Sequence, residues 1–180
     1  MSQNKIVEEI EVLKATFDYL VTERKVFPYG FSIASGKGID YKANVENILL
    51  PYKKMGIEPV IVGSGPDIVA ISETEYWQVE CKGTGSGKKQ TQRNNFDRAL
   101  SSVMSYYEDD LSELEMGERF RNAISFLGLA LPDSIEYKNE LTRRVRQPLR
   151  KRLNLWILLY GSDSKTIRPI SPDMSINLNV

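Results

Sequence analysis

The order of apolar patterns along this chain predicts an α/β protein, in which a mixed β-sheet carries helices on its faces. Stretches with helical spacing alternate with short apolar runs that are typical of strands. The chain also has 180 residues, about the size of one domain with its own hydrophobic core. We therefore predict a single domain over 1–180, with a helix and loop at 1–39 appended to a core at 40–170.

The first part of the chain predicts a helix followed by irregular structure. Apolar residues at positions 6, 10, 13, 17 and 20 recur at helical spacing over 4–24, with acidic residues between them. Residues 26–39 contain aromatic residues, Pro28 and three glycines, so a loop or a short hairpin is expected there.

The middle of the chain predicts a helix and then three strands. The helix is expected from Asp40 to Leu50, with Pro51 kinking or restarting it and Gly56 ending it. The strands are expected at 58–62, 67–71 and 76–81. Their linkers are short enough for antiparallel neighbours.

The rest of the chain alternates between helix-like and strand-like patterns. We expect a helix at 90–107, a buried strand at 123–131, a helix at 134–153 that Pro148 interrupts, and a buried strand at 155–160. The tail from residue 166 is either a last edge strand or irregular structure.

The composition excludes several kinds of chemistry. The chain has no histidine, which removes histidine zinc sites and the Ser-His-Asp and Cys-His arrangements. Its one cysteine, Cys81, cannot form a disulfide within the chain, and the polar N-terminus has no hydrophobic signal segment. No apolar run approaches the roughly 20 residues that span a bilayer. We expect a cytoplasmic protein in which carboxylates, carbonyls and water would bind any metal ion.

Two neighbouring predicted strands carry the residues that bear most on function. Asp67 follows Pro66 at the start of one strand, and Glu80-Cys81-Lys82 ends the next. Because side chains alternate along a strand, Glu80 and Lys82 face a cleft while Cys81 points into the core. Two carboxylates suit Mg²⁺, and a lysine beside them can orient water or neutralise charge on a phosphate. A charged pair on a half-exposed strand is the alternative interpretation.

These residues and the order of elements around them resemble the PD-(D/E)XK nuclease superfamily. The resemblance implies a restriction-endonuclease-like, three-layer α/β/α fold with a central mixed sheet of four to five strands. It implies that Asp67, Glu80 and the backbone carbonyl of Cys81 bind Mg²⁺, with Mn²⁺ able to substitute, and that Lys82 positions or deprotonates the attacking water. Many members add a glutamate from the preceding helix, directly or through water. Glu46 is the matching position here, although it could equally be solvated.

Several families of this fold also carry a glutamine and a tyrosine four residues apart on the next helix. The best alignment places Ser102 and Tyr106 at these positions, and a shifted alternative uses Gln92 with Phe96. Because Ser102 stands where these families have glutamine, the sequence leaves both pairs as candidates for this helper site.

Basic residues near the motif suggest nucleic-acid contacts. The chain has 24 basic and 24 acidic residues, so a basic face would have to be local. The candidates are Lys88, Lys89 and Arg93 after a glycine-rich loop, and Arg143, Arg144 and Arg146 further on. An exposed linker and a solvated helix are the alternatives for these two groups.

The resemblance implies a Mg²⁺-dependent endonuclease that hydrolyses DNA phosphodiester bonds. One alternative is a catalytically inactive nuclease-fold module for DNA binding or assembly. Another is a nuclease that acts on RNA or on branched DNA. A homodimer is expected only by analogy with nucleases that cut both strands.

Overall fold

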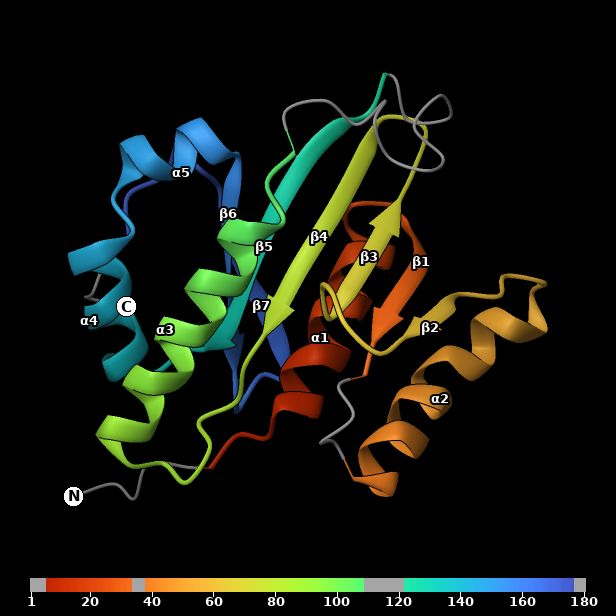
Figure 1. Ribbon diagram of the computed structural model, residues 1–180, viewed down its shortest axis with the longest axis horizontal. Helices are drawn as coiled ribbons and strands as arrows, with labels where there is room; N and C mark the ends of the chain where they lie inside the picture. Colours follow the sequence, from red (N-terminus) through yellow and green to blue (C-terminus); the bar gives the residue numbers. More distant parts are fainter. Residues whose placement is uncertain (1–5, 34–37, 109–121, 177–180) are drawn as a thin grey trace.

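The computed structural model describes residues 6–33, 38–108 and 122–176 (Figure 1). The strands are β1 (Phe27–Ser32), β2 (Val60–Val62), β3 (Ile68–Ile71), β4 (Glu75–Cys81), β5 (Ile124–Pro132), β6 (Leu155–Gly161) and β7 (Thr166–Ile170). The helices are α1 (Glu9–Thr22), α2 (Ile39–Lys54), α3 (Lys89–Ser105), α4 (Ile135–Arg144) and α5 (Gln147–Leu153). The described strands form one seven-stranded sheet, in the order β2-β1-β3-β4-β5-β6-β7.

The sheet mixes parallel and antiparallel pairs, as predicted. β4, β5 and β6 run parallel to one another, whereas β3 lies antiparallel to both β1 and β4. The antiparallel pairing of β3 with β4 was expected from their short linker. The expected pairing of β2 with β3 is wrong, because β1 lies between them and β2 runs parallel to β1.

Helices cover both faces of the sheet, so the predicted α/β class is confirmed (Figure 1). Two apolar cores result, one between α1 and the sheet and one between the sheet and α3 with α4. β5 supplies both cores by alternation: Phe126 and Ala130 face α1, while Leu127 and Leu129 face α3.

Helix α1 belongs to the core and is not an appendage of it. Its residues Leu13, Phe17 and Leu20 are fully buried against the sheet. Helix α2 is the more peripheral element, since only Val45 and Leu49 of its sixteen residues are buried. The expected division at residue 39 therefore separates segments that share one core.

Residues 26–39 contain a strand that the sequence pattern concealed. β1 pairs with β3 from Phe27 to Phe31, and an irregularity between Pro28 and Gly30 accommodates the two residues that argued against a strand. Phe31 is buried and its ring lies 5.4 Å from that of Phe17. The five expected strands correspond to β2 to β6, so β1 and the edge strand β7 explain why the sheet exceeds the four to five strands expected.

The prolines act partly as predicted. Pro51 lies within α2, which continues to Lys54 before Gly56 adopts a positive φ of 79°. Pro148 stands in the first turn of α5, so it marks the predicted interruption between α4 and α5. The tail from residue 166 forms the edge strand β7. No helix among the described residues is long and apolar enough to cross a membrane.

Candidate active site

A polar hollow of about 540 Å³ opens where β3 begins and β4 ends. Its lining comes from β1, from the β2–β3 loop up to Asp67, from the end of β4 and the residue after it, and from helices α1 and α3. Asp67, Glu80 and Lys82 all line it, so the structure brings the three residues of the predicted motif together.

The antiparallel hairpin positions these three side chains. The start of β3 lies opposite the end of β4, and the backbone N–H of Cys81 donates to Asp67 Oδ2 at 2.7 Å. Lys82 Nζ donates to Glu80 Oε1 at 2.6 Å and lies 3.7 Å from Asp67 Oδ2. It also donates to the Cys81 carbonyl at 2.8 Å. One ammonium therefore sits among the oxygens that the resemblance assigns to a metal ion.

Cys81 faces away from the hollow, as strand alternation predicted. It joins Trp77 and Val79 in the core beneath α1. Burial raises the pKa of its thiol well above the ordinary value, and the nearby Asp67 carboxylate adds to the shift. A protonated, buried thiol is a packing group and not a nucleophile.

The third carboxylate in the hollow is Glu9 of α1, which the sequence did not indicate. Glu9 Oε2 lies 3.8 Å from Lys82 Nζ, and Glu9 Oε1 accepts a hydrogen bond from Tyr41 at 3.4 Å. Glu46, the expected third carboxylate, is exposed on α2 and does not line the hollow. Helix α2 reaches this region only through the contact of Tyr41 with Glu9, because α1 is the helix that packs on the sheet.

The loop after β4 holds the start of α1 in place. Thr84 N donates to the Val7 carbonyl, and Val7 N donates to Thr84 Oγ1, each at 2.9 Å. A Cβ on Gly83 would come within 2.6 Å of the Glu9 backbone nitrogen, so only glycine permits this approach. The Tyr137 hydroxyl fixes the same loop by donating to the Gly83 carbonyl at 2.7 Å. These contacts place Glu9 beside Lys82.

Tyr106, at the end of α3, contacts Glu80 of the predicted motif directly. Its hydroxyl lies 2.8 Å from Glu80 Oε2 and 3.2 Å from the Gly65 carbonyl, and donates to one of them at a time. Ser102 lines the hollow one turn earlier. The alternative helper, Gln92, is buried elsewhere, where it accepts from Ser134 and donates to the Gly87 carbonyl. Of the two pairs, Ser102 and Tyr106 therefore line the hollow, whereas Gln92 and Phe96 do not.

Burial and like charge set the electrostatics of the hollow. Burial and, after it, the neighbouring Glu80 carboxylate raise the pKa of Asp67, Lys82 lowers it, and the net result is a pKa of about 7. Burial lowers the pKa of Lys82, but Asp67, Glu9 and Glu80 together hold it above its ordinary value. Lys82 is therefore a charged donor here, and three carboxylates share one ammonium.

The donor set fits a hard divalent cation. Carboxylate and carbonyl oxygens are the ligands that Mg²⁺ prefers, and here they already surround a positive group. Within the described residues, no three histidine, cysteine, aspartate or glutamate side chains lie close enough to hold a metal by themselves. A site built from Asp67 and Glu80 would need the Cys81 carbonyl and water to complete it.

The predicted nucleic-acid-binding residues lie outside this hollow. Arg93 pairs with Glu140 at 3.2 Å, Arg143 pairs with Glu140 at 2.5 Å, and Arg144 pairs with Asp97 and Glu140. Three others, Lys88, Lys89 and Arg146, are exposed away from it. The basic residue that does line the hollow beside Lys82 is Arg98, from the exposed part of α3.

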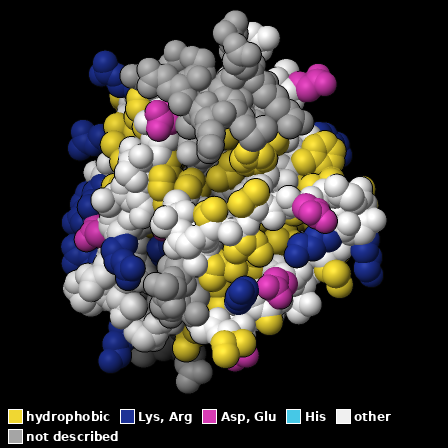
Figure 2. All heavy atoms as spheres, turned by 45° about the vertical axis from the view of Figure 1, so that its right-hand side comes forward, with side chains coloured by type: hydrophobic (Ala, Val, Ile, Leu, Met, Phe, Trp, Pro, Cys, Tyr) yellow, Lys and Arg dark blue, Asp and Glu magenta, His cyan; other side chains and the backbone are white. Residues whose placement is uncertain are grey.

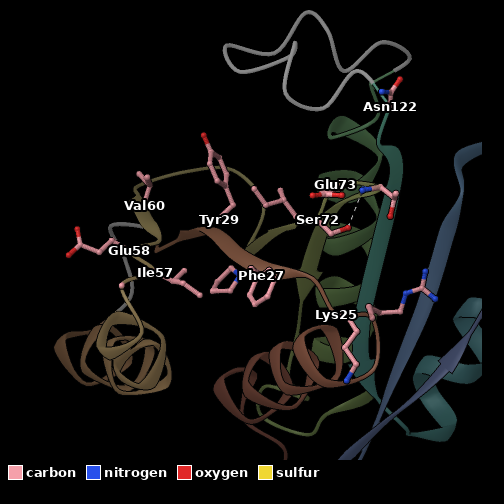
Figure 3. Close-up of a pocket in the computed structure, with 14 residues that line it drawn as sticks. Lys25, Phe27, Tyr29, Ile57, Glu58, Val60, Ser72, Glu73 and Asn122 are labelled. Atoms are coloured by element: carbon pink, nitrogen blue, oxygen red, sulfur yellow. Dashed lines mark hydrogen bonds between the residues drawn. The ribbon is translucent and has the colours of Figure 1, made fainter.

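A larger hollow of about 1050 Å³ lies at the opposite ends of β1 and β3. Tyr29, Ile57 and Val60 border it from β1, from the α2–β2 connection and from β2 (Figure 3). Figure 2 shows apolar side chains gathered on this side of the molecule. Its acidic lining residues, Glu58 and Glu73, are exposed, so the described lining of this hollow holds no buried carboxylate.

Comparison with known proteins adds no relative. No protein-family model, no curated protein and no solved structure matches this chain.

Proposed function

We propose that this protein is a Mg²⁺-dependent endonuclease that hydrolyses DNA phosphodiester bonds, with a restriction-endonuclease-like fold. The observation that carries the proposal is the Lys82 ammonium held among the oxygens of Asp67, Glu80 and Cys81. The hairpin β3–β4, followed by α3 and the parallel strand β5, also agrees in order with the elements on which the resemblance rests.

The side chains of the hollow divide the work of hydrolysis. Asp67, Glu80 and the Cys81 carbonyl would hold the metal ion, which when bound supplies Lewis-acid activation of phosphate and water. Lys82 would orient the water and neutralise charge on the phosphate, because its raised pKa makes it a donor. Tyr106 holds Glu80 in position through its hydroxyl.

The reaction consumes one water for each bond that is cut. The water oxygen bonds to phosphorus as the opposite P–O ester bond breaks, and the products are a phosphomonoester and an alcohol. The proton lost by the water passes to solvent, and the leaving oxygen takes a proton in return. Mn²⁺ would support the same reaction, since its ligands are also oxygen atoms.

Cleavage of plasmid DNA tests the proposal. We expect Mg²⁺ or Mn²⁺ to support nicking by the wild-type protein, and Asp67→Ala and Lys82→Ala to lower the rate at least about a hundredfold. Glu46→Ala is the matched control and should keep full activity, because Glu46 lies exposed outside the hollow. Equal rates in all four proteins would rule out this site. Branched DNA and RNA, tested as substrates in the same assay, show whether the protein is a nuclease that acts on a different substrate.

One observation favours a second function, an inactive module for DNA binding or assembly. The described residues contain no group of three acidic side chains that could hold a metal without help from the backbone. Titration calorimetry with Mn²⁺ separates the two functions. Binding that Asp67→Ala abolishes supports the nuclease, whereas DNA binding without any metal binding supports the module.

A further inference from the structure

The hollow contains a second feature that the metal chemistry does not use. Resting on the proposed function, we propose that Arg98, with Asn95 and Ser102, binds a substrate phosphate next to the phosphodiester that is cut. The ligand class is a nucleic-acid backbone with at least two consecutive phosphates, and the subsite lies on α3.

The three residues form a polar stripe that leads to the acidic cluster. Asn95, Arg98 and Ser102 are spaced three and four residues apart, so they share one face of the helix. All three line the hollow, and Tyr106 continues the same face to its contact with Glu80. A phosphate bound on this stripe would therefore lie beside the carboxylates and not at a remote surface.

Arg98 differs from the other arginines of this region in its pairing. Arg93 and Arg144 are held by carboxylates of α3 and α4. Across residues 6–33, 38–108 and 122–176, no hydrogen bond or ion pair engages the Arg98 side chain. Its five N–H donors therefore remain available, and a guanidinium suits bidentate contact with phosphate.

The charge distribution in the hollow also supports a role for the Arg98 cation in attracting phosphate. Lys82 is engaged by Glu9, Asp67 and Glu80, so it cannot by itself attract an anionic backbone. The lining carries three carboxylates against Lys82 and Arg98. A bound divalent metal would reverse this excess of negative charge, and Arg98 would then direct the phosphate backbone along α3.

Binding without cleavage tests the subsite independently of the chemistry. A fluorescein-labelled single-stranded DNA oligonucleotide is titrated with Ca²⁺ in place of Mg²⁺, so that a hard cation can occupy the carboxylates, and binding is followed by anisotropy with wild type, Arg98→Ala, Arg98→Lys and Arg152→Ala. Arg152 is the matched control, an exposed arginine on α5, which lies away from the site (Figure 1). We expect Arg98→Ala to weaken binding about tenfold, Arg98→Lys to restore only part of it because an ammonium cannot make the bidentate contact, and Arg152→Ala to change little.

The salt dependence gives a second readout. Losing one phosphate contact should reduce the slope of log K against log salt by about 0.7 for single-stranded DNA. Unchanged affinity and slope in Arg98→Ala, with a wild-type protein that binds and cuts, would overturn the subsite alone. A wild-type protein that binds through Arg98 but cuts nothing with Mg²⁺ or Mn²⁺ would retain the subsite and overturn the proposed nuclease. Equal weakening by Arg98→Ala and Arg152→Ala would show general charge attraction and also overturn the subsite.

Discussion

The two ends of β4 each carry a buried or half-buried glutamate, and the two are held in different ways. At the start of the strand, Glu75 accepts from Arg24 and, at 2.6 Å, from Trp77 Nε1. The Arg24 guanidinium lies 5.0 to 5.5 Å from the ring centroids of Trp77, Phe126 and Trp156. At the end of the strand, Glu80 shares one ammonium with two further carboxylates.

The difference between these clusters is one of charge balance. The first has one carboxylate and one guanidinium, which satisfies both and joins the end of α1 to the sheet. The second has three carboxylates and one lysine, and its burial raises the pKa of Asp67. Burying like charges costs free energy unless a cation shares them, and such costs concentrate at functional sites. The balanced charge of the Arg24–Glu75 cluster therefore indicates a structural role. The excess of negative charge around Lys82 indicates that the other cluster is the candidate site.

The largest expected effect is on stability, at the balanced end. Glu75→Ala leaves Arg24 without its carboxylate partner and Trp77 Nε1 without an acceptor. The two side chains of the pair are 25% and 18% exposed, so we expect a loss of about 2 kcal/mol in the free energy of unfolding, less than for a fully buried pair. Urea denaturation measures this loss. Cleavage well below the unfolding midpoint should be unchanged, and a protein that loses cleavage but not stability would place this end in the site.

A smaller effect is expected on metal affinity, at the unbalanced end. In Lys82→Met the ammonium no longer competes for the oxygens of Glu80 and Cys81, so Mn²⁺ should bind about tenfold more tightly while cleavage is lost. Titration calorimetry gives the affinity, with Lys88→Met as the control because Lys88 is exposed outside the hollow. Weaker binding in Lys82→Met would mean that the lysine supports the metal site and does not compete with it.

The sequence predicted the parts of this site that depend on local alternation. The opposite directions of Glu80 and Cys81 follow from the two-residue repeat of a strand, and the short linker brings Asp67 opposite them. Glu9 could not be found in this way, because the helix that supplies the third carboxylate is decided by packing between distant segments. Its signal was an acidic residue at the start of a strongly apolar helix.

Other predictions from the sequence were wrong for the same reason, because they depended on contacts between segments far apart in the chain. Proline and glycine at positions 28 and 30 argued against a strand, yet pairing with β3 along the sheet outweighed them. Arg93 and Arg144 appeared to be free basic residues, whereas carboxylates on the neighbouring helix pair with them. A single sequence shows which residues are charged but not which charges face one another.

The smallest expected effect concerns the two aromatic side chains that donate hydrogen bonds to the glutamates of β4, Tyr106 to Glu80 and Trp77 to Glu75. Tyr106→Phe removes the hydroxyl that donates to Glu80, and we expect cleavage to fall about threefold with little loss of stability, since Glu80 keeps its bond to Lys82. Trp77→Phe removes the donor to Glu75 from within the core, so it should lower stability and leave the cleavage rate of the folded protein intact. Initial rates and thermal melts of both variants measure the contrast. If Trp77→Phe slowed cleavage as much as Tyr106→Phe, the two ends of β4 would not be functionally distinct.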